Sequence, residues 1–154
     1  MAHYLQGRVH HDLGEAPRAI DCYQEAVDCA DTTSRDCDYS TLCRVHAQLG
    51  DLFYWQQQYQ RQQEELRKSY QYALLGGDTV LALYNCIMRG TVYSDLHQND
   101  SAIVVLEDAM LQCKQAGYDN YAAICTGGLI EPLLGKGKVQ EARQYIDLFE
   151  SESR

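Results

Sequence analysis

Small residues return along the chain at a fixed spacing. Gly7, Gly50 and Gly90 are followed at the next equivalent place by Ile130, so the steps are 43, 40 and 40 residues. Three further series keep the same steps: Ala19, Gln62, Ala102 and Ala142; Tyr23, Leu66, Leu106 and Ile146; and Ala26, Ser69, Ala109 and Phe149. Four series in one register indicate an internal repeat of about 40 residues that occurs four times.

Each repeat combines a small residue with a large one three positions later, as in Gly50 with Phe53 and Gly90 with Tyr93. His10 takes the large residue's place in the first repeat. A turn follows, and then a second small residue. Two antiparallel helices approach closely only where a side chain is missing, so a small residue on each facing surface lets a large neighbour fit across. The pattern therefore predicts a pair of antiparallel helices in each repeat.

The pattern predicts eight helices, separated by turns rich in glycine and polar residues. Their expected ranges are about 2–13, 16–30, 39–55, 59–74, 79–96, 100–115, 120–134 and 138–151. Asp38, Asp78 and Asp119 are expected to cap the helices that follow them. Pro132 lies inside the seventh expected helix, where it predicts a kink or a shortened helix.

Residues 13–27 and 99–109 carry the turn and the second helix of the pattern most clearly, and they resemble the tetratricopeptide repeat. That family builds helix pairs with small residues at fixed positions of a unit of about 34 residues. The resemblance implies an all-α fold, a right-handed superhelical α-solenoid of about four helix-turn-helix repeats. A single array would fill residues 1–154, with repeats at about 1–38, 39–78, 79–118 and 119–154.

The repeats are longer than those of the family, and they look like the long repeats of bacterial regulatory proteins and of kinesin light chains. In the bacterial proteins such an array is often attached to a DNA-binding or kinase module, so we expect this chain to be a fragment of a larger protein. The resemblance weakens in the fourth repeat, where Ile130 replaces the glycine.

Composition narrows the classes of function. Hydrophobic residues make up 45% and charged residues 23% of the chain, as in folded soluble proteins. The net charge of −9 argues against direct nucleic-acid binding by this segment, because phosphate binding needs a clustered cationic face. Apolar runs such as residues 102–106 are far shorter than the roughly 20 residues that span a bilayer, so no membrane insertion by this segment is expected. A membrane anchor elsewhere in a longer parent protein is an alternative that the sequence of this segment leaves open.

Cysteine and histidine spacings give little sign of a chemical centre. Seven cysteines without a CxxC pair favour reduced thiols and a cytoplasmic location over a disulfide framework. His10 and His11 are adjacent and point about 100° apart on a helix, so we expect no metal and no cofactor. Cys43 and His46 could act as nucleophile and base, but the sequence offers no third group to orient them, so we expect no catalysis.

The resemblance also implies which side chains face a ligand. In the family, the first helix of each pair lines a concave groove, and its contact positions correspond here to a mixed aromatic and polar set. The residues are Tyr4, Arg8, His11, Arg44, Gln48, Asp51, Tyr54, Trp55, Tyr84, Met88 and Thr91. Such a surface suits an extended peptide or an amphipathic helix. The alternative is that Tyr54, Trp55 and Tyr84 only pack between repeats.

Some family members hold the C-terminal carboxylate of a chaperone with five groove residues. The matching places here are Tyr4, Arg8, Gln48, Tyr84 and Met88, and Arg8 alone among them is cationic. A receptor for chaperone tails is therefore not expected, although Arg8 and Arg44 can still bind an acidic group through two parallel hydrogen bonds.

These observations favour a non-catalytic scaffold that binds a protein or peptide, as the sensory or assembly region of a larger bacterial regulatory protein. The alternative is a structural module that self-associates as a homodimer through exposed terminal repeats. A solenoid exposes an apolar face at each end unless a capping helix covers it, and no further helix follows to cover Ile146 and Phe149.

Overall fold

The computed structural model describes all 154 residues as eight α-helices without a strand. The helices are α1 (Ala2–Asp12), α2 (Ala16–Asp28), α3 (Tyr39–Trp55), α4 (Tyr59–Leu75), α5 (Thr79–Asp95), α6 (Asn99–Ala116), α7 (Asp119–Gly135) and α8 (Val139–Glu152). All eight predicted helices are confirmed, with ends within about two residues of the expected ones. The chain is all-α, as the repeat pattern predicts.

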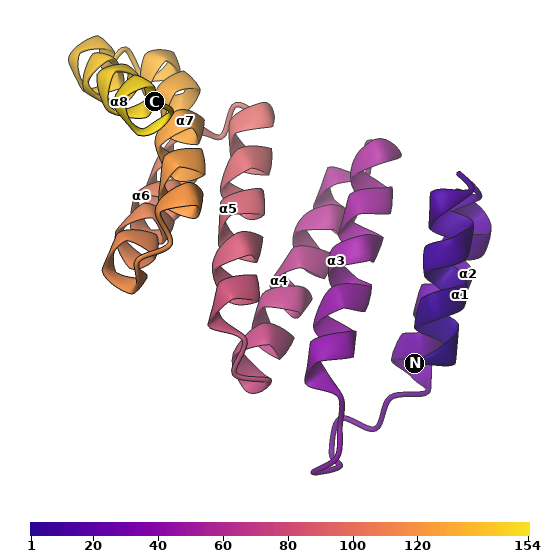
Figure 1. The fold of residues 1–154 in the computed structure, drawn as a ribbon. Coiled ribbons are helices and arrows are strands. Elements are labelled where there is room, and N and C mark those ends of the chain that lie inside the picture. Colours follow the sequence, from indigo (N-terminus) through magenta and orange to yellow (C-terminus); the bar gives the residue numbers. More distant parts are fainter. The chain divides into compact units, whose positions relative to one another are not determined.

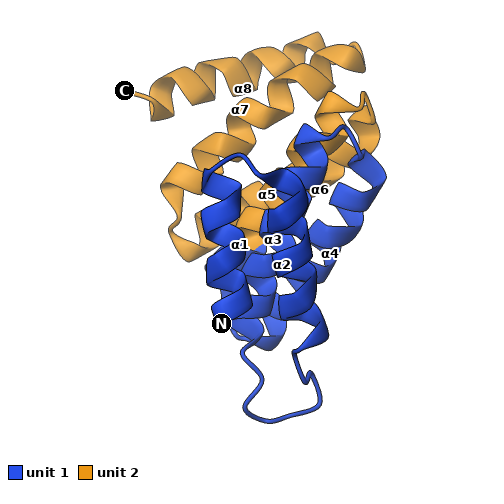
Figure 2. Cartoon of the chain, turned by 90° about the vertical axis from the view of Figure 1, so that its right-hand side faces the viewer, with its two compact units in different colours: residues 1–82 blue, residues 83–154 orange.

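Helices that follow one another in sequence pack against each other. α1 lies against α2, α3 against α4, α6 against α7, and α7 against α8 (Figure 1). The chain divides into two compact units, which we call unit 1 (Met1–Ala82) and unit 2 (Leu83–Arg154) (Figure 2). The boundary falls inside α5.

Each unit has its own apolar interior. The main cluster of unit 1 joins α1, α2 and α3 through Tyr4, Ala19, Tyr23, Val45, Leu49, Leu52 and Phe53. The cluster of unit 2 draws on all four of its helices: Leu83, Ile87, Ile103, Leu106, Ala109, Cys113, Ala122, Cys125, Leu129, Leu133 and Ala142. Burial of apolar side chains on one stripe of each helix is therefore what holds the pairs together.

The small residues of the repeat lie where helices approach each other, as the spacing predicts. A Cβ atom at Gly7 would lie 2.5 Å from the ring of Tyr23, and one at Gly90 would lie 2.6 Å from the side chain of Leu106. Real Cβ atoms essentially never make such short contacts. The missing side chains therefore let α1 approach α2 in unit 1 and let α5 approach α6 in unit 2.

The four turns inside the helix pairs share a residue with left-handed backbone. Gly14 and Gly137 have φ angles of 75° and 73°, and Gln57 and His97 reach 59° and 57° although they carry side chains. That conformation costs a residue with a Cβ atom roughly 1 kcal/mol. The same turn thus forms in all four pairs, because packing of the two helices outweighs the local preference of Gln57 and His97.

Asp38 and Asp78 cap helices as predicted. Asp38 Oδ1 accepts a hydrogen bond from the backbone N–H of Thr41 at 3.0 Å, and Asp78 Oδ1 accepts one from the backbone N–H of Leu81 at 3.0 Å. The prediction for Asp119 is wrong, because this residue is already the first of α7 and makes no cap hydrogen bond.

Pro132 does not shorten α7. The helix has 17 residues, the same length as α3, and Pro132 lies inside it close to its C-terminal end. A proline removes one intrahelical hydrogen bond and crowds the carbonyl four residues earlier. Because Pro132 is buried in the interior of unit 2, its packing offsets that loss, and the prediction of a shortened helix is wrong.

Candidate functional site

His11 connects α1 to α3 on the predicted ligand-facing side of unit 1. Its Nε2 atom lies 3.2 Å from Asp51 Oδ2, and its Nδ1 atom lies 3.3 Å from the hydroxyl oxygen of Tyr23. Asp51 is exposed and His11 is half-buried, so the pair stands at the border between interior and solvent. Two predicted ligand residues from different helices are thus brought together.

Tyr4 belongs to the interior more than to the surface. It is 8% exposed, and its ring centroid lies 6.2 Å from that of Tyr23. Its hydroxyl oxygen accepts a hydrogen bond of 3.4 Å from the exposed guanidinium of Arg8, which raises the pKa of Arg8. Burial raises the pKa of the Tyr23 hydroxyl. Tyr4 therefore positions Arg8, and of the two side chains Arg8 is the one that a ligand can reach.

Arg44, Gln48 and Asp51 follow one another along a single face of α3. Residues spaced by three or four positions lie one above the other on a helix. Arg44 and Asp51 are exposed and Gln48 is half-buried. This face of α3 therefore presents a cation, an amide and a carboxylate in a row.

An aromatic cluster closes that row at the C-terminal end of α3. Trp55 is 74% exposed, and its ring centroid lies 5.6 Å from that of Tyr54 in an edge-on arrangement. Tyr54 also meets Tyr59, the first residue of α4, edge-on at 5.9 Å. Trp55 does not pack between repeats, so the alternative reading is wrong for this residue. Tyr59 was not predicted as part of the surface, because it reaches Tyr54 only through the turn between the helices.

Unit 2 carries a second aromatic group. Tyr84 on α5 is 40% exposed and meets Tyr121 of α7 edge-on at a centroid distance of 6.4 Å. Tyr121 meets Tyr118 in the same way, also at 6.4 Å. Further along α5, Met88 is half-buried and Thr91 is exposed, and Thr91 Oγ1 donates to the carbonyl oxygen of Ile87 at 3.0 Å.

Sequence reasoning missed the contribution of α7 to this group. A step of 40 residues from Tyr84 leads to Ile124, which is exposed. The repeat register therefore points to this side of α7, although it does not reach Tyr121 itself, which lies three residues earlier. The loss of the repeat glycine at Ile130 made the fourth repeat look degenerate, although its helix presents the same face.

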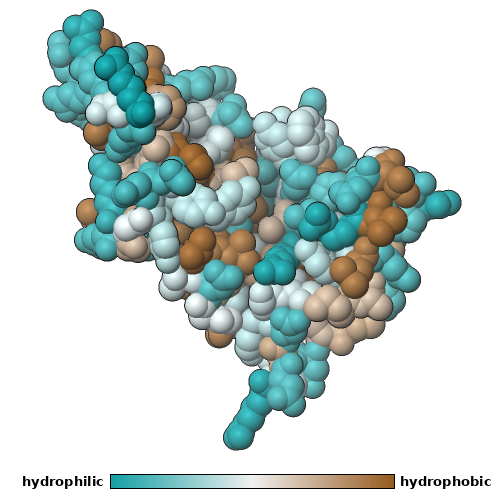
Figure 3. All heavy atoms as spheres, viewed as in Figure 1, coloured by the Kyte–Doolittle hydropathy of each residue, from teal (hydrophilic) through white to brown (hydrophobic).

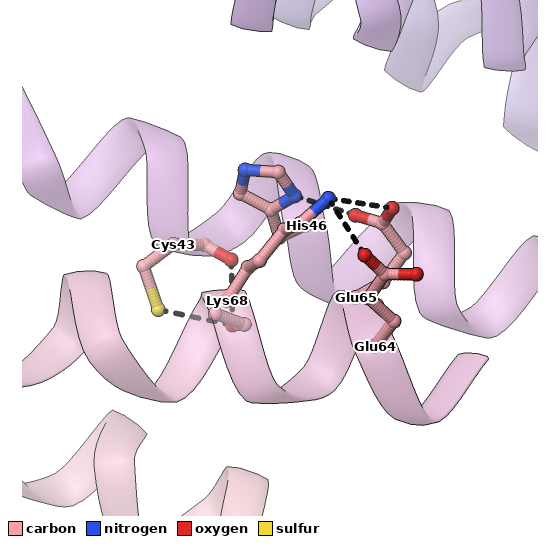
Figure 4. A network of polar contacts seen from close by, with 6 residues as sticks. Cys43, His46, Glu64, Glu65 and Lys68 are labelled. Atoms are coloured by element: carbon pink, nitrogen blue, oxygen red, sulfur yellow. Dashed lines mark hydrogen bonds and ion pairs between the residues drawn. The ribbon is translucent and has the colours of Figure 1, made fainter. Parts of the chain in front are cut away.

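Cys43 and His46, the candidate nucleophile and base, lie in the interior between α3 and α4 (Figure 4). His46 Nδ1 lies 2.5 Å from Glu65 Oε2, and Cys43 Sγ lies 3.2 Å from the hydroxyl of Ser69. Glu65 is the orienting carboxylate that the sequence did not reveal. Since Cys43 is 0% exposed, a substrate cannot reach its sulfur atom, and the group acts as a packed polar network.

Two kinds of structural feature are absent from the chain. The chain contains no group of three or more His, Cys, Asp or Glu side chains arranged to hold a metal ion. None of its helices is long and apolar enough to cross a membrane.

Comparisons with known proteins identify the fold. No protein-family model matches the chain, and no curated protein matches it by sequence. Among solved structures, it is similar to the aspartyl phosphate phosphatase F from Bacillus subtilis, with 14% identity and a TM-score of 0.83, and to BtubC from P. vanneervenii, with 14% identity and a TM-score of 0.84. It is also similar to the Rap conjugation gene regulator of the plasmid pLS20, with 17% identity and a TM-score of 0.73.

These matches cover 97–98% of this chain but 39%, 61% and 41% of the three solved chains. This chain therefore spans between two fifths and three fifths of the length of the proteins that it resembles. At identities of 14–17%, these similarities show a shared fold and do not show a shared function. The chain has a helical-repeat fold of the α-solenoid class.

Proposed function

We propose that this chain is a non-catalytic scaffold that binds a peptide or protein segment. Its main contact surface is the α1–α3 face of unit 1, which consists of Arg8 on α1 and of Arg44, Gln48, Asp51, Tyr54 and Trp55 on α3. The observation that supports this most directly is Trp55, a large aromatic side chain that is 74% exposed beside two further aromatic rings. Tryptophan and tyrosine are enriched at residues that dominate binding energy, because they bury much area and lose little conformational entropy.

The polar part of the same face indicates what the ligand carries. Arg8 and Arg44 are exposed cations, and each can donate two parallel hydrogen bonds to a carboxylate. Asp51 and Gln48 add acceptors and a donor for the backbone of an extended segment. A peptide with an apolar residue against Trp55 and an acidic residue against Arg44 fits this arrangement.

The aromatic group of unit 2 is proposed as a second contact surface. Tyr84, Tyr121 and the exposed Ile124 offer an apolar strip with two hydroxyl groups, and Met88 adds a flexible side chain that adapts to different partners. A second peptide segment can bind to this strip.

The wider role is proposed to be the sensory or assembly region of a larger regulatory protein. One of the similar structures is a Rap conjugation gene regulator in complex with the Phr* peptide, so a longer protein that contains a similar helical-repeat fold holds a peptide. The similar proteins are also longer than this chain. Both facts support the proposal that this chain is a peptide-responsive region of a larger protein.

The single tryptophan of the chain provides the test. Peptides selected from a random phage-displayed library on the immobilised chain are synthesised and titrated, and the emission of Trp55 is followed. Binding at the α1–α3 face buries the indole and shifts its emission to shorter wavelength. Trp55→Ala is expected to weaken the same peptides about 30-fold or more when binding is measured by calorimetry, as truncation of a central aromatic contact does.

The matched control is Val104→Ala on α6, which removes an exposed apolar side chain from unit 2. It is expected to leave affinity unchanged, and neither substitution is expected to alter the helical circular dichroism. Selected peptides that bind Trp55→Ala as tightly as the unchanged chain would contradict the assignment of this surface.

A further inference from the structure

α1 presents an apolar stripe to solvent. Met1, Leu5, Val9 and Leu13 follow at intervals of four residues and are 71%, 55%, 57% and 67% exposed. This spacing places them one above the other on a single side of the helix. Figure 3 shows hydrophobic atoms gathered along the part of the surface where α1 lies in Figure 1. A contiguous stripe of this kind marks an interaction surface.

The repeat register shows that a helix normally covers this side. Val9 corresponds to Leu52 of α3, 43 residues later, and Leu52 is 5% exposed within the interior cluster that α1 and α2 build against α3. The first helix of the second pair is thus covered by the pair before it. The equivalent side of α1 is exposed to solvent, and its side chains are apolar, as they are where another helix packs against them.

The opposite end of the chain does not supply that helix. In α2, Ile20 and Val27 are partly buried against the interior cluster that includes α3. Their equivalents in α8, 123 residues later, are Arg143 and Glu150, both exposed. The outer side of α8 is therefore charged, and stacking of one copy's α8 on another copy's α1 would bury these charges without partners.

α1 is complementary to itself. Arg8 and Asp12 are both exposed and lie on the same flank of the stripe, four residues apart. If two α1 helices pack antiparallel about a two-fold axis at Val9, Leu5 of each copy lies opposite Leu13 of the other. In that register, Arg8 of each copy comes within about two residues' rise, roughly 3 Å along the axis, of Asp12 of the other. This pairing therefore matches Leu5, Val9 and Leu13 and forms two ion pairs, while Met1 lies beyond the overlap of the two helices.

We propose that α1 pairs with α1 of a second copy in this antiparallel arrangement, so that the chain forms a two-fold symmetric dimer. A two-fold interface uses the same surface of both copies, as this self-complementary stripe requires. Only a few apolar residues of each copy meet in this pairing, and standard interfaces use roughly 20–30 residues per partner, so the dimer is weak and concentration-dependent. The proposal does not depend on the peptide-binding role, but both use Arg8, so that in the dimer Arg44 is the exposed cation left for a peptide.

Sedimentation velocity of the full chain over a range of concentrations at 0.15 M salt tests it. The unchanged chain is expected to shift from monomer to dimer as concentration rises. Val9→Lys sets two like charges face to face at the axis and is expected to weaken the dimer at least tenfold. The matched control is Val104→Lys, because Val104 of α6 is 68% exposed and lies outside the stripe. A chain that stays monomeric, or a dimer that Val9→Lys leaves unchanged, would overturn the proposal.

A charge exchange tests the register. Arg8→Asp and Asp12→Arg each place like charges opposite each other and are expected to weaken the dimer. The chain with both substitutions restores both ion pairs and is expected to dimerise like the unchanged chain. Both residues are exposed, so circular dichroism is expected to show the same helix content in all variants. A double variant that remains as weak as the single ones would refute the antiparallel pairing.

Discussion

The interiors of the two units are built from different kinds of side chain. Unit 1 buries His46 and Glu65, two side chains that can carry charge, together with Gln62 and Ser69. The buried polar residues of unit 2 are Asn85, Ser94 and Thr126, none of which titrates. The two units share the repeat register, so the same sequence pattern accommodates a polar interface and an almost entirely apolar one.

The polar contacts of unit 1 fix how α4 lies on α3. His46 is held by Glu65 on one side and is stacked on the ring of Tyr72, with a centroid distance of 5.4 Å and an interplanar angle of 11°. Ser69 donates to the carbonyl oxygen of Cys43 at 2.7 Å. Hydrogen bonds have a preferred direction and apolar contacts do not, so these bonds select one register of the two helices.

The interface between α6 and α7 in unit 2, which joins two successive helix pairs, depends on the fit of apolar side chains. Cys113, Cys125 and Leu129 are 0% exposed between α6 and α7. Burial raises the pKa of the Cys125 thiol to about 12, so this side chain stays neutral and packs as a small apolar group. The comparison teaches that unit 1 should be sensitive to loss of a single polar partner, whereas unit 2 should be sensitive to changes of volume.

Removal of the Glu65 carboxylate should give the largest effect. Glu65→Ala leaves the Nδ1 atom of His46 buried without its hydrogen-bond partner, and loss of one partner of a buried pair costs about 3–5 kcal/mol of stability. The loss is measured by urea denaturation, and hydrogen exchange locates it in α3 and α4. A matched apolar truncation in unit 2, Leu129→Ala, is expected to cost about 2–5 kcal/mol, with the loss located in α6 and α7.

The double substitution His46→Leu with Glu65→Leu is the control for the polar pair. It removes both partners at similar volume, so stability is expected to return close to that of the unchanged chain. If the double variant is as unstable as Glu65→Ala, the network stabilises unit 1 through packing volume, and the contrast between the two interiors fails.

Glycine substitutions test the same contrast through sterics, with a smaller effect. A Cβ atom at Gly90 in unit 2 would lie 2.6 Å from both Cγ and Cδ2 of Leu106, so Gly90→Ala is expected to cost about 1–3 kcal/mol. At Gly50 in unit 1 the nearest atom is Cδ2 of Leu66 at 3.3 Å, and alanine is favoured over glycine inside a helix by roughly 1 kcal/mol. Gly50→Ala is therefore expected to be near neutral in thermal denaturation. Equal losses at both positions would show that the α3–α4 and α5–α6 contacts are equally tight.

The repeat arithmetic predicted the helices because three of the four pairs place the repeat glycine against a large side chain of the partner helix. A missing side chain at Gly7 or Gly90 is visible in the sequence, and so is the large residue that fills the gap, Tyr23 or Leu106. The polar pair of unit 1 was not predictable in this way. His46 and Glu65 are 19 residues apart on different helices, and a glutamate in a glutamine-rich helix has the pattern of a solvated side chain.

The candidate surface was predictable only in part, for a similar reason. Trp55 and Arg44 are exposed where the family register implies ligand contacts. Tyr4 is not, because its ring packs against Tyr23, which is larger than the leucine found at that place in the next two repeats. A register transfers positions along a helix, but the size of the neighbour across the interface decides whether a side chain stays on the surface.

Helix capping gives the smallest of these effects and contrasts the helices that begin the second pair of each unit. Asp38 accepts hydrogen bonds from the side chain and the backbone of Thr41, and these hold the pKa of its carboxyl below its ordinary value. Asp38→Ala is expected to cost about 1 kcal/mol at neutral pH. Asp119 makes no cap hydrogen bond, so Asp119→Ala is expected to leave the stability of unit 2 nearly unchanged.

The direction of the pKa shift sets the pH dependence of that difference. A carboxyl whose pKa is lower in the folded than in the unfolded chain stabilises the fold fully above its unfolded pKa, near 4, and loses this contribution as the pH falls through the lowered value. The gap in stability between the unchanged chain and Asp38→Ala should therefore be constant from about pH 7 to pH 5 and should shrink below about pH 4. Urea denaturation at a series of pH values measures it. A gap that persists at pH 2 would mean that the carboxylate does not act as the cap of α3.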